Sequence, residues 1–172
     1  MSFKERLKSI SENSKVCNII LAVIVVLQIM VVSYYFIFEK EGYHSDEVWS
    51  YGLANSFYEP FIYGDTLSQD VSKCHKWVDG SDFLHYLTVQ KGEQFRYDSV
   101  WYNQSIDMHP PLYFTLLHTI SSFFPDTFSK WFGYVINIAA MAVGQVFLYK
   151  LGKTASKSKV FGLLLCVMWG FS

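Results

Sequence analysis

The sequence predicts an all-α integral membrane protein in which transmembrane helices carry a helical cap formed by a long extracytoplasmic loop. Two apolar stretches, one without charge and one charged only at Lys150, predict the transmembrane helices, because each is long enough to cross a bilayer and has basic residues beside it. Hydrophobic residues make up 51% of the 172-residue chain and aromatic residues 19%. Charged residues make up 17%, against about 25% in a typical soluble domain, and the formal net charge is −1. This composition excludes a disordered or nucleic-acid-binding chain.

The first predicted transmembrane helix covers residues 16–38 and follows a basic cytoplasmic N-terminus, residues 1–15. The stretch contains no charged residue, and at about 1.5 Å per residue a helix of this length spans the roughly 30 Å hydrocarbon core. Tyr34, Tyr35 and Phe36 at its far end form an aromatic belt of the kind found at membrane interfaces. The apolar run is longer than the h-region of a signal peptide, which has about 7–15 residues. We therefore expect an uncleaved helix with its N-terminus in the cytoplasm.

The next region, residues 39–131, is expected to form the extracytoplasmic loop. Acidic residues outnumber basic ones in most of it, and aromatic residues recur throughout, so the loop should fold as an ordered cap. Ser45 can cap a helix over residues 46–57, and residues 82–89 have the pattern of a second short helix. Most of five aromatic side chains should contact one another or the helices: Trp49, Tyr51, Phe83, Tyr86 and Trp101.

Residues 110–124 are apolar but too few to cross a bilayer, so we expect an interfacial helix over about residues 111–124 on the outer face. Residues 132–151 form the second predicted transmembrane helix, and residues 152–159 form a basic loop. Because basic loops stay in the cytoplasm, this assignment puts both lysine-rich segments on the same side. Residues 160–172 begin a further hydrophobic segment, shorter than the roughly 20 residues that a span needs. The pattern predicts a multi-pass protein of the cell membrane, of which this chain is a truncated N-terminal part.

The first candidate for chemistry is the segment His44-Ser45-Asp46-Glu47, which follows the first predicted span. Two adjacent carboxylates near an apolar surface can have separated pKa values, so that one of them serves as a general base. The same residues also suit the first turn of a helix, where acidic side chains complement the helix dipole. Spacing alone favours this second, capping interpretation.

The second candidate is the segment Asp107-Met108-His109-Pro110-Pro111-Leu112-Tyr113. Prolines can start a helix but do not fit inside one, so the helix should begin just after His109. Asp107 and His109 then lie at the mouth of the helix, where free backbone N–H groups favour a phosphate. The alternative is a turn that only changes the direction of the chain at the membrane surface.

Two weaker motifs remain open. Cys74-His75 could be half of a zinc site, although the sequence offers no second pair nearby. Asn103-Gln104-Ser105 fits the N-glycosylation sequon, a triplet that arises often by chance.

The order of these features resembles the C-type (GT-C) membrane glycosyltransferases. An acidic pair, Asp46 and Glu47, follows the first span, then comes a long aromatic outer loop, and then DMHPPLYF. The nearest branches are the protein mannosyltransferases, the aminoarabinose transferases and bacterial proteins with an HPPLYY-like sequence. The resemblance covers about residues 16–172 and matches the N-terminal module of much longer proteins.

The resemblance implies an inverting transferase that uses a polyprenyl-phosphate-linked sugar on the extracytoplasmic face. Asp46 would match the family's catalytic acid in the first loop and deprotonate the acceptor, whose identity is unknown. Glu47 would orient Asp46, or the two carboxylates would hold a divalent metal ion. His109, with Asp107 and the helix start at Pro110, would bind the lipid phosphate and stabilise the leaving group. The fragment alone is expected to be inactive.

Two other classes stay open at this point. The chain could be a non-catalytic remnant or accessory protein that keeps the first module of the same fold. It could also be a metal-dependent membrane hydrolase that uses His44, Asp46, His75 and His109.

Overall fold

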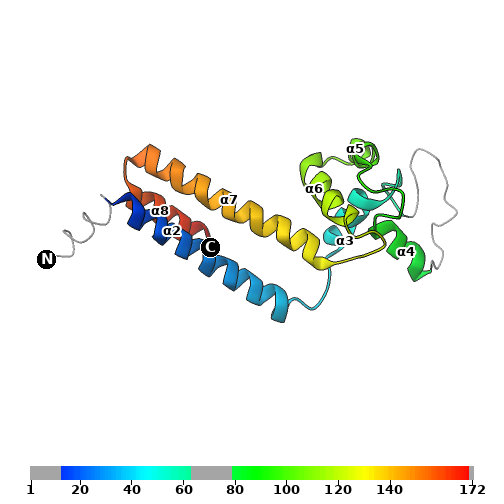
Figure 1. The fold of residues 1–172 in the computed structure, drawn as a ribbon, viewed down its shortest axis with the longest axis horizontal. Coiled ribbons are helices and arrows are strands. Elements are labelled where there is room, and N and C mark those ends of the chain that lie inside the picture. Colours follow the sequence, from blue (N-terminus) through cyan, green and yellow to red (C-terminus); the bar gives the residue numbers. More distant parts are fainter. Residues whose placement is uncertain (1–12, 63–78, 171–172) are drawn as a thin grey trace. The chain divides into compact units, whose positions relative to one another are not determined.

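The computed structural model describes residues 13–62 and 79–170, and within these ranges the chain is helical and contains no strand (Figure 1). The described residues divide into two compact units. The first unit contains the residues up to Glu41 and those from Asn137 onward, and the second contains Gly42–Ile136. The helix α7 (Lys130–Ser156) contributes its first turns to the second unit and the rest to the first.

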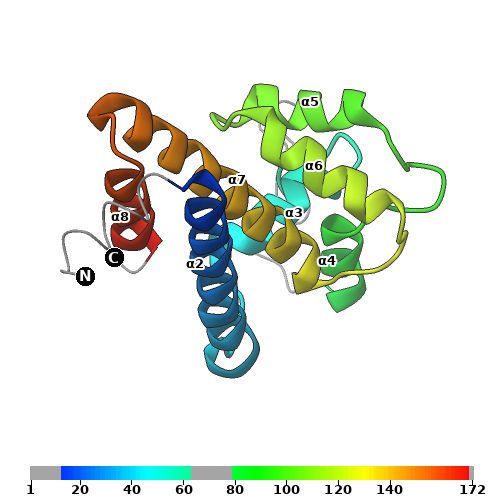
Figure 2. The same cartoon turned by 60° about the vertical axis from the view of Figure 1, so that its left-hand side comes forward.

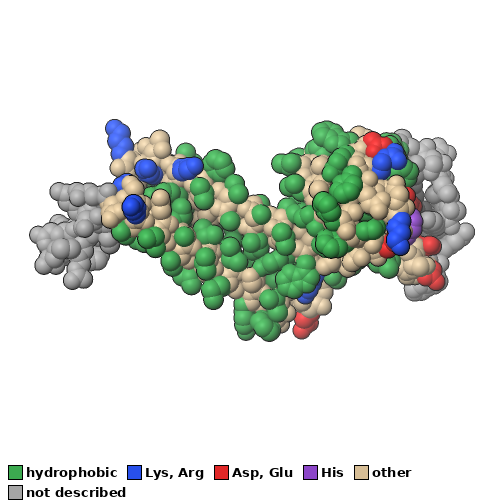
Figure 3. Space-filling model, viewed as in Figure 1, with side chains coloured by type: hydrophobic (Ala, Val, Ile, Leu, Met, Phe, Trp, Pro, Cys, Tyr) green, Lys and Arg blue, Asp and Glu red, His purple; other side chains and the backbone are tan. Residues whose placement is uncertain are grey.

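Two helices are long enough and apolar enough to cross a membrane, Ser14–Glu39 and Lys130–Ser156. The first consists of α2 (Ser14–Tyr34), which Asn13 caps through its side-chain oxygen, and a π-helical turn, η1 (Tyr35–Glu39). Most of their exposed side chains are apolar, as Figure 3 shows for the visible surface of α2 and α7. The structure therefore has the two long apolar helices that the sequence predicts, each extending a few residues beyond the predicted ends.

The first unit packs α2 side by side with α8 (Lys159–Gly170) and with the later turns of α7 (Figure 2). Gly152 of α7 and Gly162 of α8 allow close approach, because a Cβ on Gly162 would lie 2.7 Å from the Tyr149 carbonyl oxygen. Small residues have this role in many membrane helix pairs. The buried apolar residues of this unit are Cys17, Leu21, Ile24, Tyr149, Leu163 and Cys166.

Polar side chains also join the helices of the first unit. The Gln145 amide donates a short hydrogen bond to Oε1 of Gln28, and both amides donate to the Cys166 carbonyl, at 3.2 and 3.0 Å. Gln28 and Gln145 are almost fully buried. The three helices α2, α7 and α8 therefore meet at one shared carbonyl oxygen.

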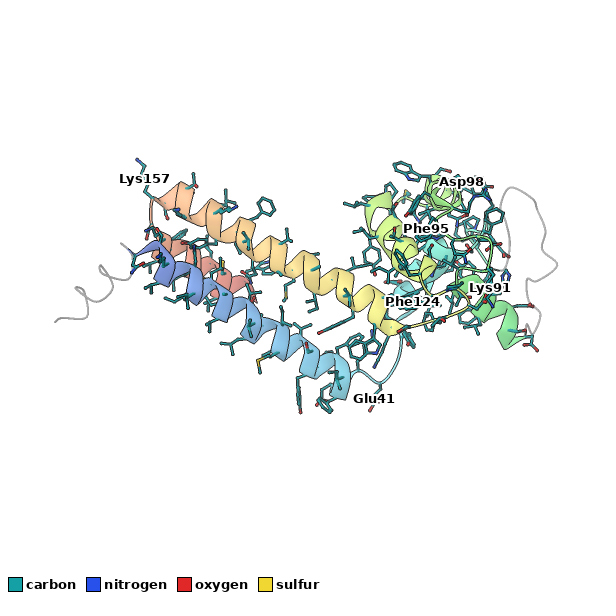
Figure 4. All side chains as sticks on the ribbon, in the orientation of Figure 1. Glu41, Lys91, Phe95, Asp98, Phe124 and Lys157 are labelled. Carbon is teal, nitrogen blue, oxygen red and sulfur yellow. The ribbon has the colours of Figure 1, made fainter. Side chains whose placement is uncertain are left out.

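The prediction that residues 152–159 form a loop is wrong for most of this segment. The helix α7 continues to Ser156 and α8 begins at Lys159, so the turn between them is short and contains Lys157, which Figure 4 labels. Lys157 adopts a left-handed backbone conformation with φ of 57°. Lys153 in the last turn of α7 suits the negative end of the helix dipole, which helps the helix to continue past the apolar stretch.

The described part of the second unit contains the three short helices that the sequence predicts and one that it does not. The expected helices are α3 (Ser45–Asn55), α4 (Gly80–Leu87) and α6 (Pro111–Ser122). The additional helix is α5 (Tyr97–Ile106). Its buried face consists of Ser99, Val100, Asn103 and Gln104, which explains why a search for apolar periodicity does not find it.

The aromatic residues of the second unit only partly form the expected cluster. Tyr51 and Tyr86 are buried among the helices, and Trp49 packs against Phe61 with ring centroids 5.4 Å apart. Trp49, Phe83 and Trp101 all lie at the surface. The buried core of the unit is formed by Tyr51, Leu53, Ala54, Ile62, Tyr86, Leu87, Val100, Phe114, Leu117 and Ile136.

Candidate functional site

The acidic pair lies in the first turn of α3, and both of its members lie close to His44. Glu47 Oε2 accepts from the His44 backbone N–H at 3.3 Å, and His44 Nδ1 accepts from the Asp46 backbone N–H at 3.3 Å. The N-cap is therefore His44, and the expectation that Ser45 caps the helix is wrong. Asp46 stays exposed, with Oδ2 3.4 Å from His44 Nδ1, whereas Glu47 is half-buried.

The HPPLY segment begins α6 as the sequence predicts. Pro110 is the N-cap and Pro111 the first helical residue, where the N–H that proline lacks would have no partner inside the helix. His109 Nδ1 lies 2.6 Å from Asp107 Oδ2. Because a carboxylate accepts, Nδ1 carries the proton of this bond, and Nε2 is the ring nitrogen left for a further ligand. The His109 side chain is largely exposed, whereas Asp107 is mostly covered.

The two candidate segments are brought together because α3 and α6 pack in parallel. At the C-terminal end of the pair, Asn55 Nδ2 donates to Ser121 Oγ at 3.2 Å, and His118 Nδ1 donates to the Ala54 carbonyl at 2.8 Å. At the N-terminal end, the charge of Glu47 acts on the Tyr113 phenol. Eight residues separate Glu47 from Asn55 along α3, and eight residues separate Tyr113 from Ser121 along α6. The acidic pair and the His109 segment therefore begin their helices at the same end.

Two tyrosines, Tyr51 and Tyr113, also belong to this region, and the sequence predicts a chemical role for neither. Burial, with a smaller contribution from the Glu47 charge, raises the pKa of both Tyr113 and Tyr51, the latter to about 12. The Tyr51 hydroxyl donates to the Ser129 carbonyl at 2.6 Å and accepts from the Gly133 N–H at 3.0 Å. The four-residue spacing between Glu47 and Tyr51 was the one sequence feature that could have predicted their proximity, because side chains four residues apart lie on the same face of a helix.

Within residues 13–62 and 79–170, the structure has no group of three or more His, Cys, Asp or Glu side chains close enough to hold a metal ion. Asp46 and Glu47 therefore have no third side chain of these four kinds within the described ranges to complete a metal site. Cys74 and His75, on which the zinc and hydrolase hypotheses depend, lie outside the described residues.

The sequon asparagine is not available to a glycosylating enzyme in this fold. Asn103 is fully buried, and its Nδ2 donates to the carbonyl oxygens of Leu53 and Ser56 and to Ser56 Oγ, at 3.0–3.2 Å. The amide that would carry a glycan instead holds α5 against the end of α3.

A pocket of about 380 Å³ lies beside α4, and it is lined by Glu59, Ser81, Asp82 and His85. None of the residues that the sequence singles out for chemistry lines this pocket. The pocket is therefore separate from the acidic pair and from the His109 segment.

Comparisons with family models, with curated proteins and with solved structures found no match to this chain.

Proposed function

We propose that this chain is the N-terminal portion of a GT-C-type membrane glycosyltransferase, which transfers a sugar from a polyprenyl-phosphate-linked donor to an acceptor outside the cytoplasm. The parallel packing of α3 and α6 carries the proposal. It brings the start of the acidic helix and the start of the HPPLY helix to one end of the second unit, with the Glu47 charge acting on Tyr113. A transferase of this kind needs a base and a phosphate-binding group near each other.

In the proposed reaction Asp46 is the general base. Its carboxylate takes the proton of the acceptor hydroxyl, and the acceptor oxygen forms a bond to the anomeric carbon. The bond between that carbon and the phosphate oxygen breaks, and the lipid phosphate leaves with the electron pair. Because attack and departure occur on opposite faces, the anomeric configuration is inverted. The exposure of Asp46 supports this role, since a base must reach its proton directly or through one water.

His109 and the start of α6 are proposed to bind the leaving phosphate. The pairing of Asp107 with His109 Nδ1 turns Nε2 to the phosphate, and the free N–H groups of the first turn after Pro110 favour an anion. Glu47 orients Asp46 or shares a divalent metal ion with it.

The proposed topology follows the lysine-rich segments. The N-terminus and the turn that contains Lys157 face the cytoplasm, and residues 39–131 lie outside. The protein is then a multi-pass protein of the cell membrane, and the acceptor reaches the site from the extracytoplasmic side.

The test is a transfer assay with the full-length protein in membranes, using labelled polyprenyl-phosphate sugars as donors. Asp46→Asn keeps the shape of the side chain and removes the base, so turnover should fall about 10²-fold or more. His109→Ala should also reduce turnover. The matched control is Asp82→Asn, which changes another exposed aspartate in the first turn of a helix and should leave turnover unchanged. Undiminished turnover of Asp46→Asn would show that Asp46 is not the base and only complements the helix dipole in the first turn of α3.

A further inference from the structure

The start of α5 carries an exposed charged pair that hydrogen bonds hold in one geometry. Arg96 donates to Asp98 from Nε at 2.9 Å and from Nη2 at 2.7 Å, and the Tyr58 hydroxyl donates to Asp98 Oδ2 at 2.6 Å. The hydrogen bonds from Arg96, and then that from Tyr58, hold the pKa of Asp98 well below its ordinary range, so this carboxylate stays charged. The side chains of Arg96 and Asp98, the latter labelled in Figure 4, are 44% and 49% exposed. The pair therefore presents both fixed acceptors and fixed donors at the surface.

Aromatic rings surround this charged pair. The Arg96 guanidinium lies over the Phe57 ring, 4.9 Å from its centroid. The rings of Phe57 and Tyr58 meet edge to face with centroids 4.9 Å apart, and the Tyr58 ring packs against Tyr102 at 5.0 Å. Phe57 and Tyr58 are nonetheless exposed. The contacts thus join rings from the segment after α3 to side chains of α5 in one continuous surface.

The outer face of α5 adds one further ring to this surface. Asp98, Trp101 and Ser105 are exposed, and their spacings of three and four residues place them along one face of the helix. Trp101 is 59% exposed, beside Tyr102 in the chain. Exposed aromatic and arginine side chains that gather in one place are typical of binding surfaces. We call the following residues the α5 platform: Phe57, Tyr58, Arg96, Asp98, Trp101 and Tyr102.

Two residues with a left-handed backbone hold the α5 platform in place. Tyr58 has φ of 54°, and Phe95, directly before Arg96, has φ of 60°. Bulky side chains rarely adopt this conformation. The Tyr58 N–H donates to Ser99 Oγ at 2.8 Å, and the Phe95 N–H donates to Ser122 Oγ at 2.9 Å, so α5 and α6 fix both residues. Such conformations persist only where the surrounding structure imposes them, and they concentrate at ligand-binding sites.

The α5 platform leads along the helix toward the proposed transfer site. The C-cap of α5 is Asp107, whose Oδ2 lies 2.6 Å from His109 Nδ1. Nine residues separate Asp98 from Asp107, which corresponds to about 14 Å along a helix. An extended ligand that lies on the platform and follows α5 therefore comes to the side chain that is proposed to bind the donor phosphate.

We propose that the α5 platform binds a saccharide chain; the further step of naming this chain as the acceptor rests on the proposed function. The faces of a sugar ring consist of C–H groups that pack on aromatic rings, and its edges carry hydroxyl groups that pair with carboxylates and guanidinium groups. The platform offers both kinds of partner side by side, and its one positive and one negative charge cancel. A lipid surface fits less well, because the charged pair would lose its water. A protein partner fits less well, because the central residues of such interfaces fill desolvated pockets, whereas these side chains lie on an outer helix face.

The test measures binding of maltotriose, cellotriose and chitotriose to the intact chain in lipid nanodiscs, by saturation-transfer NMR. At least one of these trisaccharides should bind. Trp101→Ala should weaken that binding roughly 2- to 10-fold, the range that one aromatic contact contributes, and Trp101→Phe should retain part of it. Asp98→Asn should weaken binding about tenfold or more, because hydrogen bonds to a charged group are the stronger ones. Phe83→Ala is the matched control, since it changes another exposed aromatic residue on a helix of the second unit and should leave binding unchanged.

Three results would overturn the inference. The first is the absence of saturation transfer to all three trisaccharides at millimolar concentration, and the second is an equal loss of binding in Trp101→Ala and Phe83→Ala. The third is fluorescence quenching by brominated acyl chains that disappears in Trp101→Phe, which would show that Trp101 lies in lipid. Binding without sugar transfer would support the platform and contradict the proposed function. Transfer without saccharide binding would contradict the platform alone.

Discussion

Replacement of Gly52 by alanine tests the packing that places the acidic helix α3. Gly52 is buried, and the ring of Tyr86 from α4 lies directly over it. A Cβ at this position would overlap Cε1 and Cζ of that ring, well inside the ordinary contact distance of 3.4–4 Å. The ring cannot swing away freely, because Tyr86 is 2% exposed and its hydroxyl donates to the Pro60 carbonyl at 2.9 Å.

The expected cost follows from three contributions. Forcing an extra methyl group into a filled core costs roughly 1–3 kcal/mol. A shifted Tyr86 also loses its hydrogen bond to Pro60, which contributes about 1 kcal/mol. Alanine stabilises a helix by roughly 0.8–1.0 kcal/mol relative to glycine, which offsets part of this. The net loss in the free energy of unfolding of Gly52→Ala should be about 2 kcal/mol.

Thermal unfolding in a mild detergent, followed by tryptophan fluorescence, measures this loss. For a chain of this size 1 kcal/mol corresponds to roughly 2–4 °C, so the Tm of Gly52→Ala should fall by roughly 4–8 °C. Gly80→Ala is the matched control, because Gly80 also lies in a helix and a Cβ there would meet nothing within 4 Å. In a Tyr86→Leu background, Gly52→Ala should cost much less. Equal Tm values for Gly52→Ala and Gly80→Ala would refute the packing of Tyr86 over α3.

The remaining predictions concern topology, pH and the buried amides. Labelling from the extracytoplasmic side should modify a cysteine at Gln90 and spare one at Ala155; modification at 155 would mean that α6 crosses the membrane. Burial lowers the pKa of His118, so the unfolded chain binds a proton more readily than the folded one. The stability that this burial provides should therefore be fully present above the ordinary histidine pKa of about 6.5 and should fall as the pH drops below it. When Tm is measured from about pH 8 to about pH 5, it should fall less steeply in His118→Gln than in the control His44→Gln, which changes the exposed His44. Gln145→Leu should lower the free energy of unfolding by about 0.6–2 kcal/mol, because it leaves Gln28 Oε1 buried without its donor. The double variant with Gln28→Leu should recover part of that loss in the same unfolding assay. Additive losses from the two substitutions would contradict the shared network.

The sequence predicts the elements whose signals are local. The two long apolar helices follow from long stretches with almost no charged residue, and the start of α6 follows from Pro110 and Pro111. The limit of such signals is visible in α5, where Ser99 and Asn103 are buried and Trp101 is exposed. Its inward face is defined by hydrogen bonds to α3, such as Asn103 to the Leu53 carbonyl, and a periodicity of hydrophobicity cannot reveal such partners.

The candidate site shows the same division. Asp46, Glu47, Asp107 and His109 are found by residue type and by their position beside a helix start, and the local pairs form within each segment. The register that brings the two segments to one end depends on contacts more than sixty residues apart in the chain, from His118 to the Ala54 carbonyl and from Asn55 to Ser121. No spacing rule in a single sequence contains this register. The identity of the N-cap as His44 also depends on a backbone conformation that the sequence does not specify.

Buried polar side chains fix the helix register in both units, and this connects the fold to the proposed function. In the first unit Gln28 and Gln145 meet at the Cys166 carbonyl, and in the second unit Asn55 and His118 join α3 to α6. Apolar contacts alone tolerate sliding of one helix along another, whereas a misplaced amide or imidazole leaves a buried polar group without its partner. The inward polar contacts of α6 hold the His109 segment at the same end as the acidic pair, and the alignment of the proposed base Asp46 with the proposed phosphate-binding residue His109 depends on them.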